Sequence, residues 1–208
     1  MTVVAIGASY GAAGNVIGAE LARRLEVPFL DRAIPIQVAE RLEVTIEDAA
    51  AYDYDRRAGF LERLLGAFAG ADVGVPTSPA DAYTAEDFRN ATEEVLLRQH
   101  ESGAGVILGR AAVAVLRDHP DVLRVGLDGP PEARVQQAIA LGAPDEATAR
   151  RTMHQLDRAR AEYAHRFYGV DILDRSLYHL VIDSTAISVN GCVELIAVAA
   201  GALSAAYD

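Results

Sequence analysis

The sequence predicts a three-layer α/β/α fold built around a five-stranded parallel sheet. Short apolar runs that suit buried strands alternate with longer segments of helical periodicity along the 208 residues. Strands that alternate with helices in this way form parallel sheets that are covered on both faces. The expected strands are residues 3–6, 27–31, 106–108, 122–128 and 179–183.

The composition suits a globular protein with one sizeable core. Hydrophobic residues make up 51% of the chain, and the formal net charge of −11 argues against a nucleic-acid partner. No apolar run is long and uncharged enough to predict a membrane span, and the N-terminus has no signal-peptide pattern. Cys192 is the single cysteine, which excludes an internal disulfide. We therefore expect a cytoplasmic protein with no membrane contact.

The first strand leads into a turn of small residues and then into a helix. A strand, a glycine turn and a helix N-terminus together point backbone N–H groups at one place, which is typical of a phosphate-binding loop. When Gly14 is aligned with the second glycine of the Walker A pattern G-x-x-x-x-G-K-[ST], Ser9 replaces the first glycine. Asn15 replaces the lysine and Val16 replaces the hydroxyl residue. The pattern predicts the shape of the loop without its two chemical side chains.

Two other interpretations of this turn stay open. Residues 7–11 are similar to the start of the short-chain dehydrogenase fingerprint, which would make the chain a nicotinamide oxidoreductase. That family transfers protons with a Tyr-x-x-x-Lys pair, and this chain contains no lysine. Alternatively, the small residues serve only to pack a tight connection between strand and helix.

The segment after the second strand predicts further helices and a loop. Residues 34–42 have helical periodicity, and Thr45 is a good N-cap for a helix that extends over residues 48–68. Glycines and prolines between residues 70 and 82 predict a loop. The next helix covers about residues 84–101.

Turn residues mark the helices of the C-terminal half. A short helix is expected over residues 111–117, and a proline in the first turn opens the helix over residues 131–141. Asp145 caps a long, arginine-rich helix over residues 146–167. Ser188 or Asn190 is expected to open the last helix, whose apolar part, residues 193–206, is a candidate surface for a homodimer.

Polar residues follow the expected strands. They are Ser9, Asp31, Arg110, Asp128 and Asp183. Ligands of parallel α/β sheets bind at the carboxyl ends of the strands, so these residues are candidates for binding.

Four stretches, in this order, carry a resemblance to a known family. Residues 9–18 are similar to a motif in which a serine is followed by Gly-Ser-Gly-Gly-Arg-Glu-Ile-Gly. Residues 28–32 are similar to the motif Pro-Phe-Tyr-Asp-Lys. Residues 106–112 are similar to Val-Ile-Val-Gly-Arg-Cys-Ala. Residues 157–184 are similar to Asp-Lys-Ala-Arg-x-x-Tyr, Tyr-x-Gly and Tyr-Asp-Leu-Val-Ile-Asp-Thr in succession. The chain thus resembles the cytidylate kinase-like family of bacteria.

The resemblance implies a P-loop nucleoside monophosphate kinase-like fold, in which residues 1–208 form a single domain. It implies a helical acceptor-binding insertion at about residues 33–102 and a lid at about residues 145–170. The implied reaction is phosphoryl transfer from ATP, with Mg²⁺, to a nucleoside monophosphate or a related acceptor. The ligands implied are therefore small nucleotides.

The resemblance also assigns residues to this reaction. The residues implied to hold the nucleotide donor are Ser9, Tyr10, Gly11, Ala12, Ala13, Gly14, Asn15, Val16 and Arg134. The residues implied to bind the acceptor are Asp31, Arg41 and Arg110. The residues implied to act on the migrating phosphoryl group are Arg110, Arg151, Asp157, Arg158 and Arg160.

The arginines of the expected lid have two interpretations. Arg151 and Arg158 lie two turns apart on one helical face, so they could converge on a phosphate, whose oxygens a guanidinium binds in pairs. The same spacing suits a solvated helix in which Glu146 and Glu162 are ion-pair partners.

Departures from the family pattern leave catalysis open. Asn15 carries no charge, Val16 cannot ligate Mg²⁺, and Leu108 stands where classical cytidylate kinases have an aspartate. The alternative is a pseudo-kinase that binds nucleotides as a regulatory or scaffold protein. The five histidines have no metal-like spacing, so no metal-binding side chains are expected.

Overall fold

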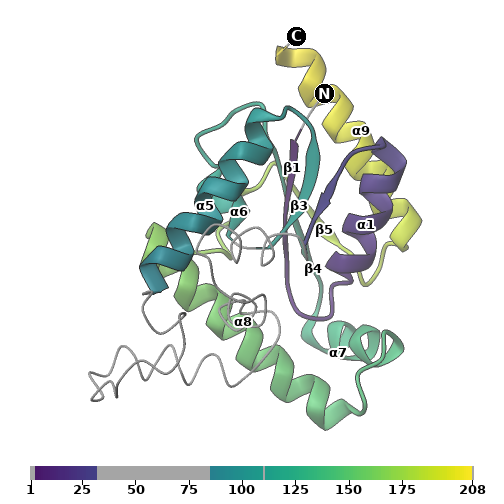
Figure 1. The fold of residues 1–208 in the computed structure, drawn as a ribbon. Coiled ribbons are helices and arrows are strands. Elements are labelled where there is room, and N and C mark those ends of the chain that lie inside the picture. The colour runs from purple at the N-terminus through teal and green to yellow at the C-terminus, as the bar shows by residue number, and fades with distance from the viewer. Residues whose placement is uncertain (1–2, 32–84, 110, 208) are drawn as a thin grey trace, which may run out of the picture. The chain divides into compact units, whose positions relative to one another are not determined.

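The computed structural model describes residues 3–31, 85–109 and 111–207 (Figure 1). The helices and the loop predicted between residues 34 and 82 lie outside the described residues. The account of the fold is therefore built on the sheet and on the helices that adjoin it.

The chain divides into two compact units. One unit comprises Met1–Asp31 and Leu96–Asp208, and the other comprises Arg32–Val95. The second unit overlaps the insertion expected at about residues 33–102. The helix α5 (Ala85–Glu101) begins in the second unit and ends in the first.

A five-stranded parallel sheet forms the centre of the first unit. Its strands are β1 (Val3–Ala8), β2 (Phe29–Leu30), β3 (Gly105–Leu108), β4 (Leu123–Asp128) and β5 (Leu180–Asp183). The strand order is β2-β3-β1-β4-β5, and each neighbouring pair is parallel. The predicted five-stranded parallel sheet is confirmed, with β1 at its centre.

Helices cover both faces of this sheet, which gives the predicted three layers (Figure 1). The helices of this unit besides α5 are α1 (Gly14–Leu25), α6 (Ala112–Val115), α7 (Pro131–Ala140), α8 (Glu146–Tyr168) and α9 (Val189–Tyr207). The helices α1 and α9 pack against each other on one face, and α6 contacts β1 on the other.

The central strand β1 is buried from both sides. Val4 and Ile6 are fully buried in a cluster that includes Ile17 of α1 and Ile196 of α9. Ala5, which points to the opposite face, is also fully buried. Burial on both faces explains why this strand is a continuous apolar run and does not alternate with polar residues.

Several elements have other bounds than the sequence predicts. β2 covers only Phe29–Leu30, less than the predicted residues 27–31, and pairs with β3 at one edge of the described sheet. α6 begins after Ala111, which has a left-handed backbone with a φ of 53° and therefore lies outside the helix. α9 begins at Val189, directly after Ser188, which is one of the two residues expected to open it; the Ser188 hydroxyl accepts a hydrogen bond from the Gly191 N–H at 3.2 Å.

The N-cap of α8 agrees with the prediction. The Asp145 side chain accepts a hydrogen bond from the Thr148 N–H at 2.7 Å, which satisfies one of the free amides at the start of the helix. Gly169 ends the helix in a left-handed conformation with a φ of 65°.

The last helix, α9, is long and apolar. By length and composition alone it could cross a membrane, and no other helix among the described residues passes that test. Here it packs against α1 and β4, and Cys192 and Ile196 lie fully buried in the core. Burial raises the pKa of the Cys192 thiol, as expected for an inert core cysteine.

Candidate functional site

The loop between β1 and α1 has the backbone of a phosphate-binding loop. Gly11 and Ala13 both have positive φ angles, of 80° and 54°. A Cβ atom added to Gly11 would lie 2.3 Å from the carbonyl oxygen of Arg134, so a larger residue does not fit there. For an alanine the left-handed conformation costs about 1 kcal/mol, so the fold maintains this loop at an energetic cost.

Four N–H groups of this loop and of the first turn of α1 have no hydrogen-bond acceptor among the described residues. They belong to Gly11, Ala13, Gly14 and Asn15. The amide of Ala12, in contrast, donates to the carbonyl oxygen of Ser9 at 3.0 Å. Free amides gathered at the N-terminus of a helix make a binding site for an anion, because they supply donors and lie at the positive end of the helix dipole.

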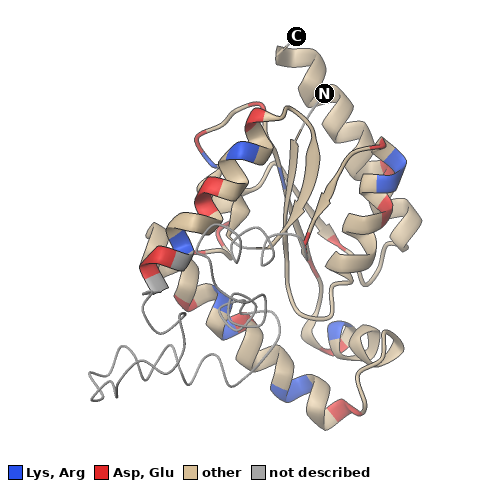
Figure 2. Ribbon diagram, viewed as in Figure 1, with Lys and Arg blue, Asp and Glu red and all other residues tan. Residues whose placement is uncertain are grey.

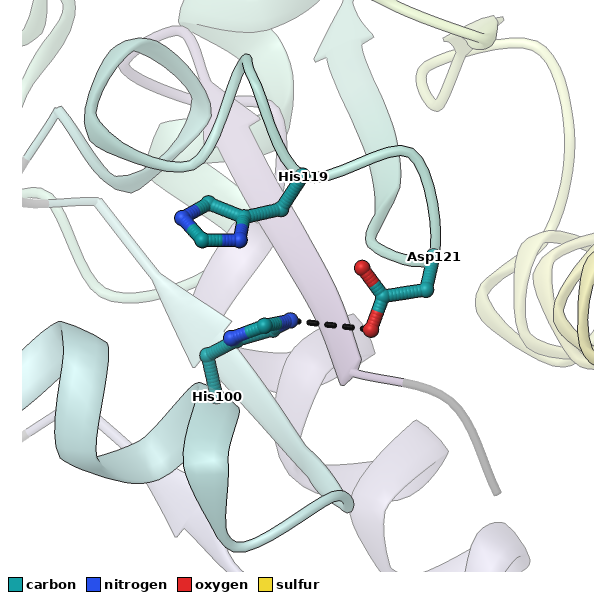
Figure 3. Close-up of side chains that lie close together, drawn as sticks. All are labelled: His100, His119 and Asp121. Atoms are coloured by element: carbon teal, nitrogen blue, oxygen red, sulfur yellow. Dashed lines mark hydrogen bonds and ion pairs between the residues drawn. The ribbon is translucent and has the colours of Figure 1, made fainter. Parts of the chain in front are cut away.

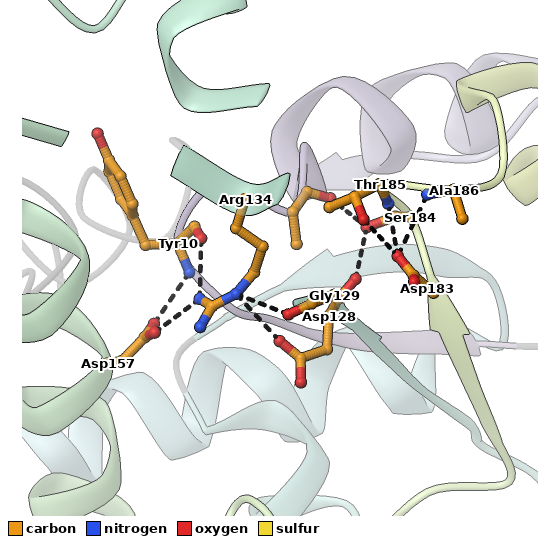
Figure 4. A network of polar contacts seen from close by, with 10 residues as sticks. Tyr10, Asp128, Gly129, Arg134, Asp157, Asp183, Ser184, Thr185 and Ala186 are labelled. Carbon is orange, nitrogen blue, oxygen red and sulfur yellow. Dashed lines mark hydrogen bonds and ion pairs between the residues drawn. The ribbon is translucent and has the colours of Figure 1, made fainter. Parts of the chain in front are cut away.

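A buried guanidinium ties this loop to two other elements (Figure 4). The side chain of Arg134 donates from Nη1 to the carbonyl oxygen of Tyr10 at 3.0 Å and to Oδ2 of Asp157 at 2.7 Å. Its Nε donates to the carbonyl oxygen of Gly129 at 3.1 Å and lies 3.4 Å from Oδ1 of Asp128. The other carboxylate oxygen of Asp157, Oδ1, accepts a hydrogen bond from the backbone N–H of Tyr10 at 3.0 Å. The loop, α7 and α8 therefore share one polar network.

This network gives Arg134 and Asp157 roles that the sequence does not predict. Arg134 was expected beside the donor base, but it is only 8% exposed and its guanidinium binds protein groups. Asp157 was expected in the lid, and it does lie on α8, where its carboxylate binds the loop itself. Both residues hold the loop in place from its α7 and α8 side.

A second anchor holds the loop from β5 (Figure 4). Ser184 is 4% exposed, and its hydroxyl donates to the carbonyl oxygen of Ala12 at 2.8 Å. The neighbouring carboxylate of Asp183 accepts from the hydroxyl and amide of Thr185 at 2.6 and 3.0 Å. These hydrogen bonds lower the pKa of Asp183 below its usual range. Asp183 therefore caps the turn that positions Ser184.

Further charged residues are spread along α8 (Figure 2), and several of them are exposed. Arg158 pairs with Glu162 at 2.7 Å, and its side chain is 77% exposed. Arg151 donates to the hydroxyl of Thr148 at 3.0 Å. Glu146 pairs at 2.7 Å with Arg150 and not with Arg151. The arrangement of this side matches the solvated, ion-paired helix that was the alternative to a phosphate clamp.

Arg160 lies on α8 near the sheet. Burial raises the pKa of Tyr178 above its usual value, and the positive charge of Arg160 partly offsets this rise. The ring of Tyr178 packs over Gly7 and Gly126, and its hydroxyl donates to the carbonyl oxygen of Ile172 at 2.8 Å. The ring of Tyr178 therefore covers β1 and β4, the two strands that lead into the candidate site.

The acceptor residues are described in part. Asp31 is half-buried and follows β2, at the carboxyl edge of the sheet. Arg41 and Arg110 lie outside the described residues.

The residues at the loop fit a phosphate better than they fit a metal ion. The four free amides are suitable donors for phosphate oxygens. Val16 and Leu108 offer no oxygen ligand, and Leu108 packs toward the loop, where a Cβ added to Gly14 would lie 3.1 Å from one of its methyl groups. Asp128 keeps one buried carboxylate oxygen that has no hydrogen bond within the described part of the chain.

Two residues of the site were not singled out from the sequence. The hydroxyl of Ser184 binds the backbone carbonyl of Ala12, and the ring of Tyr178 packs over two glycines of the sheet. Neither contact can be recognised from the spacing of residues in the sequence. Both lie inside the stretch 157–184, whose likeness to the family motif was the signal that could have pointed to them.

The chain has relatives among curated proteins. In curated collections the chain is similar to a cytidylate kinase of Methanopyrus kandleri, with 32% identity over 112 residues. That match covers 49% of this chain and 58% of the relative, so the chain spans little more than half the length of that protein. A cytidylate kinase of Pyrobaculum arsenaticum is 25% identical over 196 residues, which cover 94% of this chain and 90% of the relative.

Solved structures support the same architecture. An uncharacterized protein from Eubacterium ventriosum has a TM-score of 0.66 and 17% identity over 97% of this chain and 99% of the other. Shikimate kinase from Bacteroides thetaiotaomicron has a TM-score of 0.51 and 15% identity over 94% of this chain and 95% of the other. These likenesses show a P-loop kinase fold.

A family model matches most of the chain. The model of the cytidylate kinase-like family matches residues 3–186, which include every described element of the sheet and the whole of the loop network. The ordered motifs, the P-loop kinase fold and this match lead to one assignment. The chain belongs to the cytidylate kinase-like family.

Proposed function

We propose that the chain is a phosphotransferase that binds ATP at the loop between β1 and α1 and phosphorylates a nucleoside monophosphate. The observation that carries this proposal is the set of four amides, of Gly11, Ala13, Gly14 and Asn15, without an acceptor among the described residues. Main-chain amides at a helix N-terminus bind phosphate without help from side chains. Membership of the cytidylate kinase-like family supports a kinase-like activity on nucleotides.

The proposed donor site needs positive charge from outside the loop. Phosphoryl transfer is accelerated mainly by cations that stabilise the charge on the migrating group. Asn15 is neutral and exposed, and the guanidinium of Arg134 binds Asp157. In the proposal, Arg110, Arg151, Arg158 and Arg160 supply this charge. Mg²⁺ enters as the ion of the nucleotide, because Val16 and Leu108 offer no ligand.

In this proposal Asp157 is a positioning residue. A carboxylate beside a phosphate site repels the ligand unless a cation offsets its charge. The Nη1 atom of Arg134 lies 2.7 Å from the Asp157 carboxylate and provides that offset. The pair can therefore hold the Tyr10 amide without a net negative charge at the loop.

The acceptor is proposed from the relatives and from the family motif. Two curated relatives are named cytidylate kinase, so cytidine monophosphate is the first acceptor to test. Asp31, Arg41 and Arg110 match the acceptor residues of the family motif. ATP and nucleoside monophosphates are abundant in the cytoplasm, which is the compartment we propose.

The test is a coupled assay with ATP, Mg²⁺ and a panel of monophosphates, on the wild type and on Asn15→Lys. A lysine at this position restores the charge that P-loop kinases use. We expect it to raise the turnover number by about a hundredfold, which corresponds to about 3 kcal/mol of barrier. Gln136→Lys on the exposed side of α7 adds the same charge elsewhere and is the matched control. Absence of nucleotide binding in thermal-shift measurements of the wild type would reject the donor site.

A second candidate function is favoured by Asn15 and Val16. Their uncharged, oxygen-poor side chains suit a pseudo-kinase that binds nucleotides in a regulatory or scaffold role. Nucleotide binding without turnover in the wild type would support this candidate, whether or not Asn15→Lys gains turnover. Turnover by the wild type with any monophosphate would reject it.

A further inference from the structure

Three potential metal ligands meet at the amino edge of the sheet (Figure 3). His100 lies in the last turn of α5, just before β3, and His119 and Asp121 lie in the segment that leads into β4. The loop between β1 and α1 follows the carboxyl end of β1, at the opposite edge of the sheet. The cluster is therefore separate from the candidate nucleotide site.

The geometry of the cluster is close to that of a metal site. Nε2 of His100 lies 2.9 Å from Oδ2 of Asp121, and the ring centroids of His100 and His119 are 4.2 Å apart. One ligand atom from each residue lies within 4.8 Å of the other two. Tetrahedral Zn²⁺ with bonds of about 2.0–2.1 Å keeps its ligand atoms about 3.3–3.5 Å apart. Side-chain adjustments of about 1 Å or less bring the three atoms to that spacing.

The surroundings favour a cation. His100 lies at the C-terminal end of α5, where the helix dipole is negative. The side chain of His100 is 18% exposed and that of Asp121 is 53% exposed, so a metal ion has access from solvent and retains room for water.

We propose that His100, His119 and Asp121 bind a divalent transition-metal ion of the Zn²⁺ class, with water as the fourth ligand. Two imidazole nitrogens and one carboxylate oxygen suit Zn²⁺ and its neighbours, whereas Mg²⁺ and Ca²⁺ prefer oxygen ligands throughout. The ion joins the end of α5 to the segment before β4. It thus links the entries of β3 and β4, the two neighbours of β1.

The His100–Asp121 hydrogen bond also forms without a metal ion, so the test must separate the two. His119 has a ring contact with His100 and no side-chain hydrogen bond to any described residue. His119→Asn therefore removes a ligand and leaves the His100–Asp121 pair intact. His154 is exposed on α8, and His154→Asn is the matched control for the loss of one histidine.

The experiment measures binding of Zn²⁺ and Co²⁺ to the 208-residue chain by equilibrium dialysis, and the visible absorption spectrum of bound Co²⁺ reports its coordination. We expect the wild type and His154→Asn each to bind one equivalent of metal. The Tm of both proteins should be higher with the metal ion than without it. His119→Asn is expected to bind at least about tenfold more weakly and to lose the Co²⁺ spectrum of the wild type. A wild type that binds no metal would overturn the proposal, as would His119→Asn binding as tightly as the wild type.

Discussion

The helix α8 carries charged residues on two sides, and the two sides differ in what surrounds them. On one side, Asp157 binds the amide of Tyr10 and the buried guanidinium of Arg134, which is 8% exposed. On the other side, Arg158 pairs with Glu162 while 77% and 45% of their side chains stay in contact with solvent. Water screens the second pair and is mostly excluded from the first.

This difference shows why charge by itself is a poor guide to function on a helix. Both sides contain arginine next to acid, and both have the same distance of 2.7 Å between charged atoms. Arg134 also binds two backbone carbonyl oxygens, whereas Arg158 pairs with a neighbour one turn along its own helix. The number of partners and their burial decide which pair positions the loop.

The largest expected effect comes from Arg134→Gln, which removes the guanidinium from the buried side. Asp157 would keep its charge without its ion-pair partner, and we expect a loss of about 3 kcal/mol in the free energy of unfolding. Urea denaturation measures this change. Arg158→Gln is the matched control on the exposed side, with a Tm expected within about 1 °C of the wild type. Equal losses in both variants would contradict the comparison.

A smaller effect is expected from Ser184→Ala, which tests the second anchor of the same loop. The carbonyl oxygen of Ala12 would lose its buried hydrogen bond, at a cost of about 1 kcal/mol. Ser184→Thr keeps the hydroxyl and is expected to retain nucleotide-induced stabilisation, which Ser184→Ala reduces. Thermal-shift measurements of each variant, without and with ATP, give its stability and its stabilisation by the nucleotide. If the two variants respond alike to ATP, the hydroxyl does not position the loop.

The smallest effect is expected at the start of α8, from Asp145→Ala. The amide and hydroxyl of Thr148 lower the pKa of Asp145, so the folded state favours the charged carboxylate. This stabilisation is present above the unfolded pKa of about 3.9 and is lost as the pH falls through the lower pKa of the folded state. The variant should melt about 2 °C lower than the wild type at neutral pH. The difference should shrink below about pH 4, and a constant difference would contradict the pKa shift.

Much of the architecture follows from local sequence. The apolar run of β1, the glycine turn and the proline and aspartate that open α7 and α8 predict strand, loop and helices, because each acts within a few residues. The parallel direction of the five strands follows from their alternation with helices, whereas their order in the sheet does not. The loop 9–16 was likewise predicted as a phosphate cradle, and its left-handed Ala13 and free amides fit that prediction.

The roles of individual charged residues needed the tertiary structure. Sequence spacing treats Arg134, Asp157 and Arg158 alike, but burial separates the first two from the third. His100 and Asp121 are 21 residues apart, so helical or turn periodicity does not connect them. They meet because β3 and β4 flank β1 in one parallel sheet, which aligns the segments that enter those strands. The sequence by itself determined the strands, the helices and the loop, since these depend on local backbone preferences, and the packing of the sheet decided which side chains meet.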